Sequence, residues 1–345
     1  GLTSLALPLL LAACSSAPAA QTPGPETAAR DDTARATTAG GIPAGILVVA
    51  NQQSASASVI ELPSGETTHI PVGTGPHEAA ISADGRWGIV TIYGTQVAGN
   101  QLAVIDLDTK AVVRTIDLGE YRRPHGVVAM PGSPELAVVT SEAARHVLVV
   151  DIAQGQVVTA IPTEARGSHM VALTADGARA FTANIPDGSV TELDLSGRDL
   201  VRVTPVATMT EGVAVTPDGS EVWVGSNDAG TVSVLDTEKN EVVATVTGMQ
   251  MPYRLGISAD GRLAVVPDPE GNAVYLIDVE SRAITGSVTG LASPRGVSIS
   301  PDGRTAFVTL GEGSGVAVVD VATKAVVRTF PVQSSPDGVA FFPQR

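Results

Sequence analysis

Short apolar runs recur at a regular interval along the chain and alternate with polar turns rich in Asp, Gly, Thr and Pro. One pattern, clearest at 76–85 as Pro-His-Glu-Ala-Ala-Ile-Ser-Ala-Asp-Gly, occurs seven times. Its copies begin at Pro76, Pro124, Ser168, Thr210, Pro252, Pro294 and Pro336, and the last four steps are each 42 residues. A repeat of this length built from short strands predicts a β-propeller in which each repeat forms one four-stranded blade.

Each repeat is predicted to contain four antiparallel strands of different character. The innermost strand ends in a Pro-Asp-Gly or Ala-Asp-Gly turn, where Asp caps its own backbone and Gly accepts a positive φ. The five Asp-Gly pairs, at Asp84, Asp176, Asp218, Asp260 and Asp302, are therefore interpreted as turn residues. The third strand closes with an acid, as in Val-Ile-Asp at 104–106, and the outermost strand carries Lys or Arg, which discourage pairing with other chains.

The two ends of the repeat region are out of phase with the blades. The segment 46–51 matches a second strand, whereas 338–342 matches an innermost strand with nothing after it. We therefore expect residues 336–342 to complete the sheet begun at 45–73 and so to close the ring. The prediction is an all-β, seven-bladed propeller over residues 42–345.

With these motifs in place, the chain resembles the YVTN-repeat β-propeller family. The matching segments are 213–219 (Val-Ala-Val-Thr-Pro-Asp-Gly), 307–309 (Phe-Val-Thr) and 234–236 (Val-Leu-Asp), and the resemblance extends over 45–342. The family implies the fold specifically but the function only loosely, because such propellers include surface-layer and envelope binding proteins, lactonase-like proteins and redox relatives.

Composition refines this picture in two ways. Hydrophobic residues make up 43% of the chain but aromatic residues only 3%, so the core must consist of Val, Ala, Ile and Leu. The net charge of −15 argues against nucleic-acid binding, which requires clustered Lys and Arg.

The N-terminal segment predicts export and a membrane anchor. Leu-Ala-Ala-Cys at 11–14 resembles a bacterial lipobox, in which Cys14 is lipidated and becomes the mature N-terminus. We interpret 1–13 as a signal peptide lacking its upstream part, and 14–41 as the lipidated cysteine with a disordered tether. The expected location is the cell envelope, with the chain held at the membrane by its lipid.

One residue of each copy, directly after the starting position, is polar where a core strand would be apolar. In order, these ring residues are His77, His125, His169, Glu211, Tyr253, Arg295 and Asp337. Innermost strands of a propeller begin around one mouth of the central channel, so these side chains are expected to meet there. Three imidazoles and the Glu211 carboxylate would suit a divalent transition metal.

Two other interpretations of the ring remain open. A positive cluster near the same segments would suit a small anionic ligand, with His77 and His125 as acid–base groups; its members are Arg122, Arg123, Arg166, Arg254 and Arg295. Alternatively, duplication of one ancestral Pro-His would align the histidines without any site. The other two histidines, His69 on an outer strand and His146 in a loop, are expected to be solvated.

We therefore expect a ligand-binding or protein-interaction module, monomeric, whose partner is a small anion or another envelope protein. The alternative function is an enzyme, metal-dependent or lactonase-like, acting at the same mouth.

Overall fold

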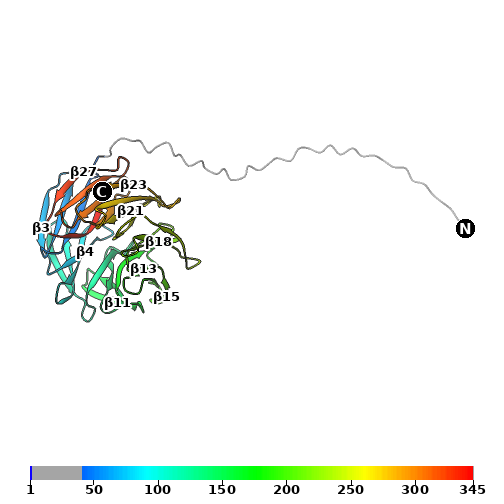
Figure 1. Ribbon diagram of the computed structural model, residues 1–345. Coiled ribbons are helices and arrows are strands. Elements are labelled where there is room, and N and C mark those ends of the chain that lie inside the picture. Colours follow the sequence, from blue (N-terminus) through cyan, green and yellow to red (C-terminus); the bar gives the residue numbers. More distant parts are fainter. Residues whose placement is uncertain (2–40, 345) are drawn as a thin grey trace. The chain divides into compact units, whose positions relative to one another are not determined.

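The computed structural model describes Gly1 and residues 41–344, and within them seven four-stranded antiparallel sheets follow one another around a ring (Figure 1). Blade 1 contains β28 and β1–β3, and blades 2–7 follow in chain order, four strands each. Cys14 and, apart from Gly1 and Gly41, the predicted signal peptide and tether lie outside the described residues. Within those residues there is no helix long and apolar enough to cross a membrane.

The strands fall into four groups according to their place in the blade. The innermost strands are β28 (Pro336–Pro343), β4 (Pro76–Ile81), β8 (Pro124–Ala129), β12 (Ser168–Leu173), β16 (Thr210–Val215), β20 (Gly256–Ile257) and β24 (Pro294–Ile299). The second strands are β1 (Gly45–Asn51), β5 (Trp87–Gly94), β9 (Leu136–Ser141), β13 (Arg179–Asn184), β17 (Glu221–Ser226), β21 (Leu263–Asp268) and β25 (Thr305–Leu310). The third strands are β2 (Ser56–Leu62), β6 (Ala98–Asp106), β10 (His146–Asp151), β14 (Ser189–Asp194), β18 (Thr231–Asp236), β22 (Ala273–Asp278) and β26 (Gly315–Asp320). The outermost strands are β3 (Thr67–Pro71), β7 (Ala111–Asp117), β11 (Gln156–Pro162), β15 (Asp199–Pro205), β19 (Glu241–Val246), β23 (Ala283–Thr289) and β27 (Ala325–Pro331).

The core lies between the faces of neighbouring blades. For example, Ile89 and Leu102 of blade 2 pack against Val139 and Leu148 of blade 3. Second and third strands are buried on both faces, which explains their continuous apolar runs, whereas outermost strands such as β27 are largely exposed. The aliphatic core expected from the composition is confirmed.

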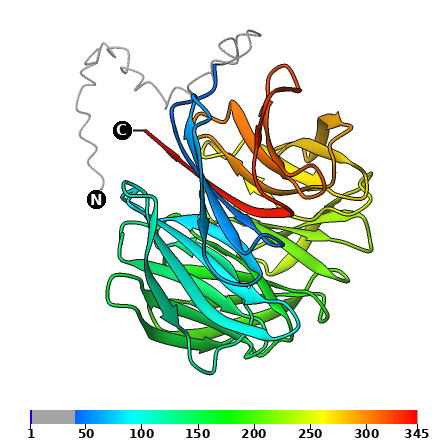
Figure 2. The same cartoon turned by 90° about the vertical axis from the view of Figure 1, so that its left-hand side faces the viewer.

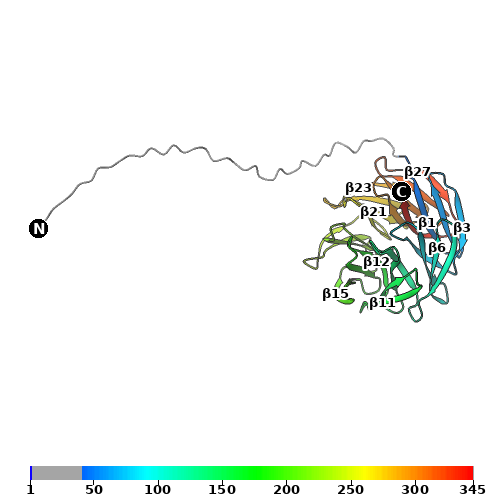
Figure 3. The same cartoon turned by 180° about the vertical axis from the view of Figure 1, so that it is seen from behind.

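The ring is closed by the last strand, as predicted. β28 pairs antiparallel with β1, from Gly45↔Pro343 to Asn51↔Pro336, and lies beside it in Figure 2. Innermost strands also contact their neighbours all the way round, and β28 contacts both β24 and β4. Figure 3 shows the same succession of blades from behind. The seven-bladed fold and its closure are therefore confirmed.

Candidate functional site

A β-bulge directs the ring residues into the channel. In blade 2, Pro76 pairs with Ile92 and Ala79 with Val90, so β4 holds one residue more than β5 between these pairs. The same irregularity recurs at the start of β8, β12, β16 and β24. A bulge changes the direction of its side chains, so the polar residue after each starting position can point inward and not into the blade core.

Threonines on the second strands hold these bulges in place. Thr140 Oγ1 accepts a hydrogen bond from Gly126 N (2.8 Å) and donates one to the main-chain oxygen of His169 (2.6 Å). Thr309 bonds Gly296 N and Asp337 O in the same way, both at 2.7 Å. Each hydroxyl thus satisfies an amide that the bulge removed from the ladder and fixes the ring residue of the next blade.

The residue after the ring position is Gly in four blades, because the backbone of the next blade passes close by. A Cβ on Gly126 would lie 2.9 Å from His169 O, and one on Gly212 would lie 2.7 Å from Tyr253 O. Glu78 and Arg254 replace this glycine in blades 2 and 6, and both are buried. Glu78 was not singled out from the sequence, although a charged residue at a position that is Gly in four blades and Met170 in another was a usable signal.

The three ring histidines stack at the centre of the mouth. The His125 ring centroid lies 3.4 Å from that of His169 and 4.1 Å from that of His77, and the three residues are 0%, 8% and 8% exposed. Among the described residues, neither nitrogen of His125 has a hydrogen-bond partner. Burial, followed by the charges of His169 and His77, holds the pKa of His125 well below its usual value. His125 is therefore a neutral imidazole with an available lone pair.

A buried guanidinium joins carboxylates from two other blades. Arg254 donates to Glu78 Oε1 from Nε (3.0 Å) and Nη2 (2.7 Å), and to Glu211 Oε1 from Nη1 (2.5 Å). Burial opposes ionisation of these carboxyls. Even so, Arg254 lowers the pKa of Glu78, and His169 and Arg254 together lower that of Glu211 to about 2. Both carboxyls are ionised at neutral pH.

His169 is held by carboxylates on both sides. Its Nε2 lies 2.8 Å from Glu211 Oε1 and its Nδ1 lies 3.5 Å from Glu142 Oε2. Burial opposes its protonation, but the Glu211 charge and the bonds to both carboxylates raise the pKa of His169 to about 9. His169 is thus an imidazolium, unlike its neighbour His125.

Asp337 approaches the cluster from blade 1. It is 1% exposed, its Oδ2 lies 3.2 Å from His77 Nδ1, and its Oδ1 lies 4.0 Å from Arg254 Nη2. The first of these contacts is not aligned for a hydrogen bond and the second is too long for one. Both Asp337 oxygens therefore lack a hydrogen-bond partner within the described part of the chain.

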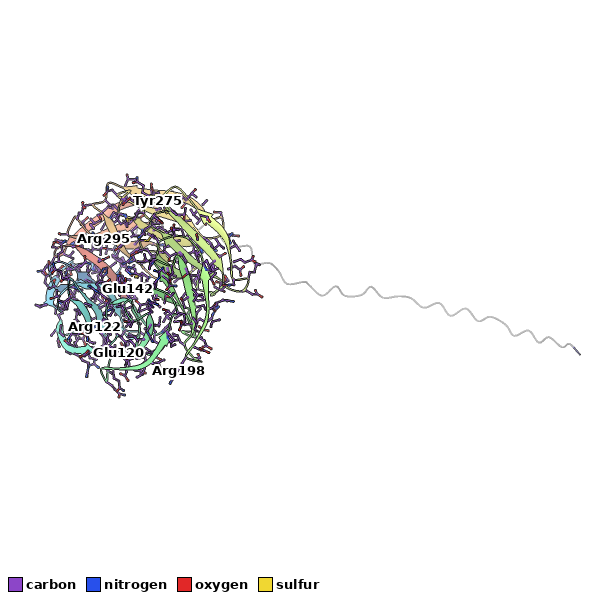
Figure 4. The ribbon with its side chains drawn as sticks, turned by 60° about the horizontal axis from the view of Figure 1, so that its bottom comes forward. Glu120, Arg122, Glu142, Arg198, Tyr275 and Arg295 are labelled. Carbon is purple, nitrogen blue, oxygen red and sulfur yellow. The ribbon has the colours of Figure 1, made fainter. Side chains whose placement is uncertain are left out.

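The outer layer of the mouth comes from blade ends and loops that vary between repeats. Tyr93 donates to Glu142 Oε2 (2.9 Å), and Asn227 Nδ2 donates to Glu211 Oε2 (3.2 Å). In Figure 4, Glu142 projects closer to the middle of the ring than Arg198 does. These residues were missed at the sequence level, although Tyr93, Glu142 and Asn227 share one register, directly after the second-strand residue that pairs with the starting position of the blade.

The arginines expected to form a positive cluster each contact a different group, and Arg254 is the one that contacts Glu78 and Glu211. Arg122 is exposed, and the Arg123 guanidinium lies 4.6 Å from the Tyr93 ring centroid and donates to Thr95 O (2.7 Å). Arg295 donates to Ser335 Oγ (3.3 Å), and Arg166 pairs with Asp187 (2.6 Å).

Tyr253 packs its ring against Arg254, whose guanidinium carbon lies 4.2 Å from the ring centroid. His69 is exposed on β3, as expected. His146 was predicted to be a solvated loop residue. This prediction was wrong, because His146 is the first residue of β10 and is half-buried beside Tyr121.

Comparison with known proteins supports the fold. A family model described as the cytochrome D1 heme domain matches residues 131–270. No curated protein matches the chain. A chain of the Kuenenia stuttgartiensis hydrazine synthase superposes with a TM-score of 0.73 at 18% sequence identity, over 81% of this chain and 93% of that one. Identity this low shows the propeller architecture alone, and the YVTN-repeat resemblance stays a prediction beyond that architecture.

Proposed function

We propose that this protein is a binding module that takes up a small cation at the mouth of its central channel. The observation that carries the proposal is a set of buried polar atoms at the mouth that lack a partner. Within the described residues, both nitrogens of His125 and both oxygens of Asp337 make no hydrogen bond, and they lie among the buried carboxylates of Glu78 and Glu211. A bound cation would give such lone pairs a partner, since an unpaired buried polar group is costly.

The contacts of Arg254 favour a cation over the anionic ligand suggested by the arginines. The Arg254 guanidinium already gives three of its five N–H donors to Glu78 and Glu211, and these two carboxylates offset its positive charge, so it attracts a further anion only weakly. Arg123 and Arg295 are likewise engaged with neighbouring groups at the rim. The mouth therefore offers an incoming ligand lone pairs and negative charge.

Haem binding is a second candidate, favoured by the family model over residues 131–270. The side chains at the mouth do not fit such a group. Three imidazoles stacked at 3.4 Å and 4.1 Å, together with Arg254 and its carboxylates, occupy the centre. A haem-sized ligand needs a pocket of several hundred Å³. It would have to displace this whole cluster, so we assign no haem to the mouth.

The enzyme alternative, metal-dependent or lactonase-like, would use the same cluster. A catalytic metal keeps one coordination position open to substrate. His77, His125 and His169 are at most 8% exposed, which favours holding an ion over turning over a larger molecule.

The location of the module is proposed from the sequence. Lipidated Cys14 would hold a monomer at the membrane of the cell envelope, outside the cytoplasm. Partition of the chain into detergent tests this, and unchanged partition of a Cys14→Ala variant would contradict it.

Thermal unfolding of the full chain with matched cations and anions tests the cation site. We expect at least one of Zn²⁺, Cu²⁺, Ca²⁺ and ammonium to raise the melting temperature, because a ligand that binds only the folded state stabilises it. Phosphate, sulfate and citrate should leave it unchanged. An Arg122→Ala variant, altered at an exposed rim residue, should respond as the parent does. Stabilisation by the anions and by none of the cations would overturn the proposal.

A further inference from the structure

We propose that the cation is a divalent first-row transition metal, bound by His77, Glu78 and His125. This inference rests on the proposed function, because it names the ion for the same site. Within residues 41–344, these three side chains are buried and each offers a ligand atom, all within 4.8 Å of one another. Ligands bonded at about 2.0–2.2 Å to one tetrahedral ion lie roughly 3.3–3.5 Å apart, so small side-chain rotations suffice to close the set.

The assigned ligands differ from the set expected from the sequence. His169 already forms ion pairs with Glu211 and Glu142, and Glu211 also forms an ion pair with Arg254. Those groups therefore balance one another's charge. His125 has no such partner, and Glu78 leaves its Oε2 without a bond to Arg254, whose contacts go to Oε1.

The unpartnered His125 imidazole is the second observation that points to a ligand. It is 0% exposed and carries two nitrogens without a hydrogen bond within the described part of the chain. Buried polar atoms normally find a partner. Coordination of a metal by one His125 nitrogen would give that atom a partner without any rearrangement of the backbone.

The supporting groups are placed as metal sites require. Asp337 Oδ2 lies 3.2 Å from His77 Nδ1, without the alignment of a hydrogen bond. A carboxylate this close to a proposed ligand adds negative charge that favours a bound cation. The backbones of the ligands are fixed, because Thr91 accepts from Glu78 N (2.9 Å) and Thr140 accepts from Gly126 N, next to His125 (2.8 Å).

The donor set selects the class of metal. Two imidazole nitrogens and one carboxylate oxygen suit Zn²⁺, Cu²⁺, Ni²⁺ or Fe²⁺. Mg²⁺ and Ca²⁺ prefer oxygen ligands throughout and should bind at most weakly.

Metal content of the full chain, prepared without a histidine tag, tests the inference. After treatment with a chelator and reconstitution with each metal, we expect about one equivalent of a transition metal to remain after gel filtration. The Cu²⁺ form should show nitrogen hyperfine splitting from two imidazoles. No retained transition metal, or a spectrum with three nitrogens or none, would overturn the assignment.

Variants separate the ligands from other histidines. Glu78→Gln and His125→Gln should each lower the affinity for the metal at least tenfold, whereas His69→Ala, on the exposed face of β3, should keep it. Because Glu78→Gln also weakens the contact with Arg254, His125→Gln, which breaks no hydrogen bond, is the decisive variant if the first does not fold. Full retention of metal by a folded His125→Gln variant would overturn the inference.

The outcome also distinguishes this inference from the proposed function. If Ca²⁺ or ammonium raises the melting temperature but no transition metal is retained, the cation site stands and the metal assignment fails. If no cation of either class has an effect, both fail.

Discussion

Arg254 shows how one side chain can organise a whole site. It occupies a position that four blades give to Gly, in the blade whose innermost strand is only Gly256–Ile257. Arg254 lies just before this short strand, after Tyr253, whose amide donates to Pro267 O, and its side chain is buried at the mouth. The guanidinium then joins carboxylates of blades 2 and 5 across the mouth, with charge pairing that offsets the burial of all three groups.

Replacement of Arg254 by Met should therefore destabilise the protein strongly. It would leave Glu78 and Glu211 buried without their main partner, which we expect to cost about 3–5 kcal/mol of unfolding free energy. Denaturant unfolding at neutral pH measures this. Arg122→Met, at an exposed position, should change it by less than about 0.5 kcal/mol. Equal stability of the two variants would show that the ion cluster is not formed.

At the scale of the element, the turns after the innermost strands depend on their aspartates. Asp218 Oδ1 accepts hydrogen bonds from Thr216 Oγ1 (2.6 Å) and from Ser220 N (3.0 Å) and Oγ (2.8 Å). The Thr216 bond, followed by those from Ser220, lowers the pKa of Asp218. The same turn recurs at Asp84, Asp176, Asp260 and Asp302.

The pKa of Asp218 is lower in the folded state than in the unfolded state. The turn therefore stabilises the protein at pH values above the ordinary pKa of Asp, and this stabilisation is lost as the pH falls through the lowered pKa. Asp218→Ala should thus reduce the unfolding free energy by about 1 kcal/mol at pH 7. The difference from the parent should shrink as the pH falls below about 4. Urea unfolding of both proteins at several pH values checks this, and a difference that grows on acidification would be inconsistent with it.

At the scale of the whole molecule, stability depends on closure of the ring. β28 pairs with β1 along its length, and Phe341 packs against Phe307 of blade 7 with ring centroids 4.9 Å apart. The same strand carries Asp337 to the mouth. Fold and candidate site are therefore coupled through the last innermost strand.

Deletion of residues 336–345 should abolish cooperative unfolding, because it exposes the edge of β1 and opens the interfaces with blades 2 and 7. Calorimetry of the truncated chain tests this, with deletion of Arg345 alone as the control. A cooperative transition of the truncated chain near the melting temperature of the parent would mean that closure contributes little.

The sequence by itself determined the architecture and the position of the candidate site. The repeat at 42-residue steps gave the number of blades, the phase shift at 46–51 and 338–342 gave the closure, and the ring position gave His77, His125 and His169. These features can be predicted from the sequence because each depends on the local residue pattern and its position within the repeat, and duplication of the repeat preserves both.

Only the tertiary structure decided how the charges at the mouth are paired. Glu78 and Arg254 are 176 residues apart, and Glu142 and Asn227 stand at one register position whose residue type differs from blade to blade. Which imidazole is neutral and which is protonated depends on burial and on carboxylates from other blades, as His125 and His169 show. Such pairings arise from proximity across the channel, and no periodicity along the chain encodes them.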